Sequence, residues 1–150
     1  MKQFFLLLLG GIFLSACTSD EDEAISAGRY GMMSTETPQY AAVIFVRSIY
    51  NDKTLDRAIN NSTEHFGKII RNHHTPKNVQ RHVLNLRLDS MNVEPMAGGT
   101  LIYSDQIKEA EVEVKITGEF NREPKVDLKT ISMVRESGKW LVSDVRNTIP

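Results

Sequence analysis

The sequence contains a single cysteine, Cys17, in 150 residues. A lone cysteine excludes any disulfide within the chain, so the fold must depend on its hydrophobic core. A glycine-rich phosphate loop is also missing, because Gly98-Gly99 is not followed by the lysine and the helix that such a loop needs. No Gly-x-Ser-x-Gly nucleophile elbow is present. The sequence therefore gives no support to a disulfide scaffold, a P-loop nucleotide-binding protein or an α/β-hydrolase.

An excess of charge of one sign is missing as well. The chain carries 18 Lys and Arg against 19 Asp and Glu, and it has no basic run that would attract nucleic acid or anionic lipid. The histidines are His65, His73, His74 and His82. Adjacent histidines diverge by about 100° on a helix, although a loop could bring them together. We expect no nucleic-acid partner, no metal site and no cofactor.

The amino-terminal residues have the layout of an export signal. Met1-Lys2-Gln3 is followed by an uncharged, apolar stretch from Phe4 to Leu14. As a helix this stretch would span about 16 Å, roughly half of the ~30 Å hydrocarbon core of a bilayer. The pattern predicts a removable signal peptide over residues 1–16 rather than a transmembrane anchor.

The signal closes with Leu14-Ser15-Ala16-Cys17, which resembles the lipobox of bacterial lipoproteins. The resemblance implies that the Cys17 thiol takes the diacylglycerol and that Cys17 becomes the acylated first residue, carrying chains such as palmitate. Burial of acyl methylenes at ~0.8 kcal/mol each makes such a terminus a durable membrane anchor. Thr18, rather than an aspartate, follows Cys17. By resemblance to Gram-negative sorting rules, this implies the periplasmic face of the outer membrane.

We divide the remainder into a tether and one domain. Residues 17–36 contain the acidic run Asp20-Glu21-Asp22-Glu23 near their start and have no apolar period to bury. This composition predicts a lipidated, acidic, flexible tether, with cation binding by the four acids as the alternative. Residues 37–150 are long enough for one hydrophobic core and short for two.

Helical periodicity comes first in this domain. Thr37 before Pro38 is a typical N-cap and first helical position, and apolar residues then recur at helical spacing until Asn51-Asp52. A short second helix capped by Thr54 and a third helix that carries Phe66 follow. The sequence predicts three helices before any strand.

The start of the first strand is ambiguous, because the apolar residues between 79 and 88 fit both a helix and a strand. We place the start between residues 80 and 86 and the end at Glu94-Pro95, with Gly98-Gly99 turning the chain. Alternation is clear from Ala110 to Phe120 and predicts a strand with one buried face. A loop over residues 121–125 leads to the next strand.

The last hairpin turns at Ser137-Gly138. A three-residue loop would place Trp140 beside Val134, on the buried face of Val112, whereas a two-residue loop would flip it. We favour the three-residue loop, because the other register would leave the tryptophan in water.

Helices followed by a long antiparallel sheet that ends in Ser137-Gly138-Lys139-Trp140-Leu141-Val142 look like the nuclear transport factor 2-like superfamily. The resemblance spans residues 38–146 and is carried by residues 45–59 and the last strand. It implies an α+β fold in which amino-terminal helices pack on a strongly curved antiparallel sheet, a cystatin-like cone that often holds an apolar pocket. The resemblance supports the fold better than any activity.

Enzymes of that superfamily place an Asp or His with Tyr in the pocket, which implies Asp144 with Tyr40 or Tyr50 as acid–base candidates. Asp144 could equally pair with Arg146 or with water at the end of the sheet. The candidates for lining a ligand pocket are Phe45, Tyr50, Phe66, Phe120 and Trp140. Their spacing is also that of core residues, so plain packing is the alternative.

These observations favour a membrane-anchored envelope lipoprotein that is not an enzyme and that binds a small apolar ligand or a protein partner. An isomerase or dehydratase with an acid–base pocket in the cone is the alternative. A third hypothesis is a homodimer formed through the sheet, with Ile131 and Met133 as an apolar surface patch.

Overall fold

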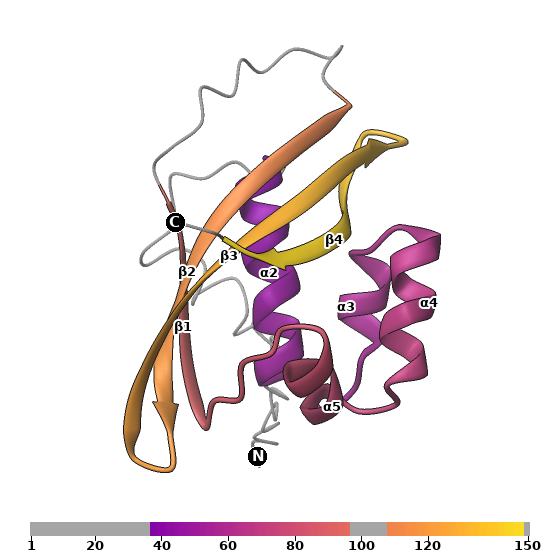
Figure 1. The fold of residues 1–150 in the computed structure, drawn as a ribbon. Coiled ribbons are helices and arrows are strands. Elements are labelled where there is room, and N and C mark those ends of the chain that lie inside the picture. Colours follow the sequence, from indigo (N-terminus) through magenta and orange to yellow (C-terminus); the bar gives the residue numbers. More distant parts are fainter. Residues whose placement is uncertain (1–36, 97–107, 149–150) are drawn as a thin grey trace, which may run out of the picture. The chain divides into compact units, whose positions relative to one another are not determined.

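The computed structural model describes residues 37–96 and 108–148, so the predicted signal peptide, lipobox and tether and the predicted turn at Gly98-Gly99 lie outside the described residues. The elements run α2 (Pro38–Asn51), α3 (Asp56–Asn60), α4 (Glu64–Asn72), α5 (Pro76–His82), β1 (Ser90–Pro95), β2 (Glu109–Phe120), β3 (Glu123–Glu136) and β4 (Lys139–Asn147) (Figure 1). The described strands form one open antiparallel sheet in the order β1-β2-β3-β4. The prediction of an α+β fold with helices first is confirmed.

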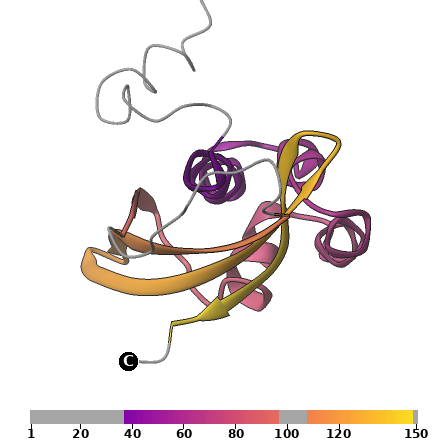
Figure 2. The same cartoon turned by 90° about the horizontal axis from the view of Figure 1, so that it is seen from above.

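Helix α2 begins and ends as the sequence predicts. Thr37 is the N-cap, and its Oγ1 accepts a hydrogen bond from the backbone N–H of Tyr40 at 3.2 Å. Pro38 starts the helix and Asp52 ends it. α2 contacts all four strands, and Figure 2 shows it lying on one side of the sheet. We call this side the inner face and the opposite side the outer face.

Helices α3 and α4 lie beside β4 rather than on the centre of the sheet (Figure 1). The chain between them pairs with that strand, because the Val142 N–H donates to Asn61 O and the Thr63 N–H donates to Val142 O, both at 2.9 Å. Thr54 is not the N-cap of α3. It precedes the N-cap residue Leu55, and its hydroxyl donates to Asp56 Oδ2 at 2.9 Å.

The prediction of three helices and of a strand starting between residues 80 and 86 is wrong. A fourth helix, α5, occupies Pro76–His82, and the first strand begins only at Ser90. Thr75 caps α5 by accepting from the Asn78 N–H at 3.3 Å. Leu84 and Leu88 are buried in the irregular segment that follows. The spacing of these leucines therefore reflects the burial of an irregular segment rather than strand pairing.

Both described hairpins have two-residue turns. Asn121 and Arg122 have φ of 53° and 66°, and Glu123 already pairs with Phe120, so the predicted loop over residues 121–125 is too long. In the second turn Ser137 and Gly138 have φ of 50° and 84°. The three-residue loop is therefore wrong.

Trp140 is nevertheless buried, at 8% exposure, because it pairs with Arg135 and not with Val134. Val112 on the inner face pairs with Ile131, so the odd-numbered residues of β3 point inward and Val134 points outward. The predicted side for Trp140 is correct although the predicted register is not.

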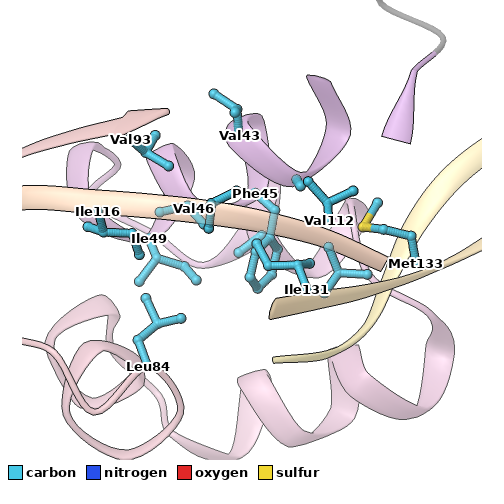
Figure 3. Close-up of a cluster of buried hydrophobic side chains, with 14 of the residues drawn as sticks. Val43, Phe45, Val46, Ile49, Leu84, Val93, Val112, Ile116, Ile131 and Met133 are labelled. Atoms are coloured by element: carbon cyan, nitrogen blue, oxygen red, sulfur yellow. The ribbon is translucent and has the colours of Figure 1, made fainter. Parts of the chain in front are cut away.

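The hydrophobic core lies between α2 and the inner face. Figure 3 shows Phe45, Val46 and Ile49 of α2 among side chains of the sheet, with Leu84 closing the same cluster. The labelled sheet residues are Val93, Val112, Ile116, Ile131 and Met133, all at most 3% exposed. Each such side chain contributes about 1.5–3 kcal/mol by leaving water, so this layer holds the helices on the sheet.

Candidate functional site: an inverted half of strand β3

The acid–base candidates do not converge. A bulge in β4 shifts the pairing, since Met133 pairs with Val142 while Ser132 pairs with Asp144. Beyond this bulge Asp144 and Arg146 both point to the outer face, where Arg146 donates to Glu111 Oε1 at 2.7 Å. Asp144 is exposed to water.

Tyr40 and Tyr50 lie on the other side, on α2. They are ten positions apart, which is about 15 Å along a helix. The hydroxyl of Tyr50 donates to the backbone oxygen of Leu86 at 2.8 Å. Asp144 and these tyrosines are therefore on opposite faces of the sheet, and the structure does not bring them together.

The aromatic pocket candidates are also dispersed. Phe45 and Phe66 pack on each other in the core with ring centroids 6.0 Å apart. Phe120 pairs with Glu123 at one end of the β2–β3 hairpin, and Trp140 pairs with Arg135 near the other end of β3. The separation of 12 positions from Glu123 to Arg135 corresponds to roughly 40 Å of extended strand. These side chains cannot line one pocket for a small ligand.

A polar cluster that the sequence reasoning missed lies on the inner face. Lys129 is the only charged residue among the buried ones in the described part of the chain, with 1% of its side chain exposed. Its Nζ donates to Asp127 Oδ2 at 2.8 Å and to the side-chain oxygen of Asn147. The backbone N–H of Leu128 occupies the other oxygen of Asp127 at 2.8 Å.

Tyr50 is electrostatically coupled to this cluster. Burial raises the pKa of the Tyr50 hydroxyl above its ordinary value, and the negative charge of Asp127 raises it further. The phenol therefore stays protonated and keeps its bond to Leu86. Because both oxygens of Asp127 are engaged, the cluster is internally satisfied as it stands and joins the end of β4 to β3.

The cluster arises because, in the half of β3 from Pro124 to Lys129, charged residues point inward and apolar residues point outward. Lys125, Asp127 and Lys129 continue the inward-pointing odd positions of the strand, and the pairing with β2 has no register shift. The even positions Val126 and Leu128 therefore point outward, and they are 65% and 38% exposed. Charged residues thus occupy inward positions while apolar residues face water.

We call Pro124, Val126 and Leu128 the apolar ridge of the outer face. On β2 their partners are Glu119, Thr117 and Lys115. Further along β2, the outer face carries three exposed acids, Glu109, Glu111 and Glu113. The outer face therefore combines exposed apolar side chains with a row of carboxylates.

The backbone of the same segment is partly blocked against adding another strand. Pairing with β4 ends at Lys129, so the edge of β3 next to the ridge has no strand partner among the described residues. Pro124 has no N–H, the Leu128 N–H is bonded to Asp127, and the Leu128 carbonyl accepts from the Thr148 N–H at 3.0 Å. The edge therefore lacks a continuous row of free backbone groups, which disfavours the addition of a strand.

Three other expectations concern the dimer patch, the histidines and a membrane span. Ile131 and Met133 are 0% and 1% exposed in the core, so they cannot form the apolar surface patch of a dimer.

The rings of His73 and His82 stack with centroids 5.6 Å apart. Within residues 37–96 and 108–148, no group of three or more His, Cys, Asp or Glu residues is placed to hold a metal ion. In the same ranges, none of the helices is both long and apolar enough to cross a membrane.

Comparison with known proteins adds no relative: no family model, no curated protein and no solved structure matches this chain.

Proposed function

We propose that this protein is a lipid-anchored envelope lipoprotein whose domain binds a protein partner through the outer face of its sheet and does not catalyse a reaction. The Leu14–Cys17 lipobox resemblance supports the anchor. The observation that carries the binding proposal is the exposure of Val126 and Leu128 on a face that elsewhere carries mostly charged and polar side chains. Neighbouring exposed apolar side chains that form a contiguous patch rimmed by polar residues are typical of an interaction site.

A protein partner fits this surface better than a small apolar ligand. Small ligands are held in concave sites that enclose most of their surface. The aromatic residues that could line such a site are spread over the core and both ends of the sheet, whereas the apolar ridge stands on an outward face. An outward ridge of apolar side chains beside charges is typical of a protein interface.

The charges define the chemistry of the partner. Glu109 and Glu113 are exposed on the outer face beside Glu111, whose carboxylate binds Arg146. A partner that presents apolar side chains bordered by lysine or arginine would be complementary. A second copy docking through the same face would bring the acidic rows together, so we expect the domain to be monomeric.

We also propose that the domain belongs to the nuclear transport factor 2-like superfamily. The order of helices before a four-stranded antiparallel sheet, with α2 on its inner face, supports this kinship.

One observation favours a second candidate function, an isomerase or dehydratase. The carboxylate of Asp127, rather than that of Asp144, is close enough to Tyr50 to affect its pKa. Proton transfer by Asp127 would require Lys129 to release Oδ2. This candidate would be established by isomerase or dehydratase activity that the parent chain shows and that Asp127→Asn loses with its fold intact by circular dichroism.

The anchor is tested by mass spectrometry of the native protein. We expect the mature chain to begin at an acylated Cys17 and the Cys17→Ser precursor to remain unacylated. An intact, unmodified amino terminus on the native protein would refute the anchor.

The outer-face interaction is tested by photo-crosslinking in cells from single positions of the full-length protein. A photoreactive residue at Val126 is expected to form one discrete adduct, and one at the exposed Lys53 on the helical side is not. Charge reversal at Glu109 and Glu113 should abolish the adduct from Val126. An adduct that survives this reversal would show that the acidic row takes no part.

A further inference from the structure

Basic residues are concentrated in one part of the chain. Between Glu64 and Asp89 the sequence contains no acidic residue, and this stretch holds all four histidines and five of the lysines and arginines. The five are Lys68, Arg71, Lys77, Arg81 and Arg87. Since the whole chain has a net charge of −1, this stretch is electrostatically distinct from the rest.

The fold brings much of this charge to the corner where α4 meets α5. Arg71 lies in the last turn of α4, and Lys77 and Arg81 lie on α5 at the spacing that places side chains on one face. His73 at the end of α4 stacks on His82 at the end of α5, which holds the two helix ends together. We call Arg71, His74, Lys77, Arg81 and His82 the basic corner; all five are exposed.

The cations of the corner lack internal neutralisation. Lys68, one turn before Arg71, donates to Glu64 at 2.7 Å. No ion pair involves Arg71, Lys77 or Arg81 among residues 37–96 and 108–148. The basic side chains are separated along the sequence and come from two helices, which is why no basic run is visible before folding.

We propose that the basic corner docks on an anionic phospholipid surface, which rests on the proposed lipid anchor because the anchor would keep the domain beside a membrane. Lysine and arginine near an anionic surface each strengthen attraction. The corner belongs to the helices, so this orientation leaves the acidic outer face of the sheet available to a protein partner.

A lipid surface fits the corner better than a nucleic acid does. Proteins that bind single strands combine cations with exposed aromatic rings on which bases stack. Between Glu64 and Asp89 the only Phe, Tyr or Trp is Phe66, and it is 3% exposed in the core. The corner therefore offers cations but no stacking platform.

The test uses the mature chain carrying Cys17→Ser, so that no acyl chain contributes, and vesicles made of equal parts of phosphatidylcholine and phosphatidylglycerol. We expect co-sedimentation with these vesicles about tenfold above that with pure phosphatidylcholine, falling as salt rises. The triple variant R71Q/K77Q/R81Q should lose this difference. The control K53Q/K108Q/K139Q removes the same charge at exposed positions elsewhere and should keep most of it.

Equal binding to both kinds of vesicle, or equal loss in the two triple variants, would overturn the proposal. The proposal would also be overturned if the triple variant R71Q/K77Q/R81Q kept vesicle binding but lost binding to single-stranded RNA. Light scattering that shows self-association through the basic corner would overturn it as well. Circular dichroism of both variants checks that the fold is intact. The outcome is independent of the acylation measurement, so failure of the corner and failure of the anchor are distinguishable.

Discussion

The two halves of β3 follow opposite patterns on one continuous strand. From Ile131 to Met133 the apolar residues point inward and are at most 1% exposed. From Val126 to Leu128 the apolar residues point outward, and Lys129 takes an inward position opposite Val114. The register with β2 is continuous through both halves, so the inversion lies in the side chains and not in the backbone. Natural sequences violate burial patterns chiefly where function requires it.

Substitutions of core residues in the half of β3 around Ile131 should lower the stability of the fold most. Ile131→Ala removes a fully buried side chain and should lower the free energy of unfolding by about 2–5 kcal/mol. Val126→Ala, at 65% exposure, should change it by less than about 0.5 kcal/mol. Urea unfolding of the two variants measures the contrast. Similar losses in both would mean that the halves do not differ as described.

Lys129 should be the next most sensitive position. Lys129→Ala leaves Asp127 without its cation, which costs about 3 kcal/mol for a buried pair and less here because the Asp127 side chain is 32% exposed. The double variant Lys129→Met with Asp127→Asn removes both charges at similar volume and should recover most of the loss. If the double variant is as unstable as Lys129→Ala in urea, the ion pair is not the source of the effect.

The sequence predicts the elements with strong, uninterrupted periodicity. α2 is correct to its caps because Thr37-Pro38 and a continuous apolar stripe agree, and β2 is correct because its alternation never breaks. α5 could have been found, since Thr75-Pro76 repeats the same cap signal. The leucines at 84, 86 and 88 obscured this helix, because their alternation is typical of a strand.

The candidate site could not be predicted from local pattern. The alternation of Val126 and Leu128 with charges indicates that the charges face water, and only the pairing of Ile131 with Val112 reveals the opposite. A signal was present in the shift of apolar residues from even to odd positions along β3. Interpreting it required the register with β2, which depends on the two-residue turn at Asn121-Arg122.

Tyr50 should show a smaller, pH-dependent effect. Tyr50→Phe leaves the Leu86 carbonyl without its donor and should cost about 1–2 kcal/mol near neutral pH. Since the pKa of Tyr50 is raised above 10.0 in the folded chain, its stabilising contribution is present below about pH 10 and is lost as the pH rises further.

The Tyr50 comparison is made by urea unfolding at neutral pH and above about pH 10. The parent chain should lose more stability than Tyr50→Phe over this interval, so the gap between them should narrow. A constant gap would show that the Tyr50 hydroxyl titrates alike in the folded and unfolded chains.

The proposed function depends most directly on whether the apolar ridge binds a partner. The measurement is in-cell photo-crosslinking from Thr117, which faces Val126 across the strands, in the double variant Val126→Thr with Leu128→Thr and in the control Ile69→Thr. We predict that the double variant unfolds within about 0.5 kcal/mol of the parent and loses the adduct, whereas the control keeps it. An unchanged adduct in the stably folded double variant would contradict the proposal that the inverted half of β3 is the working surface of this protein.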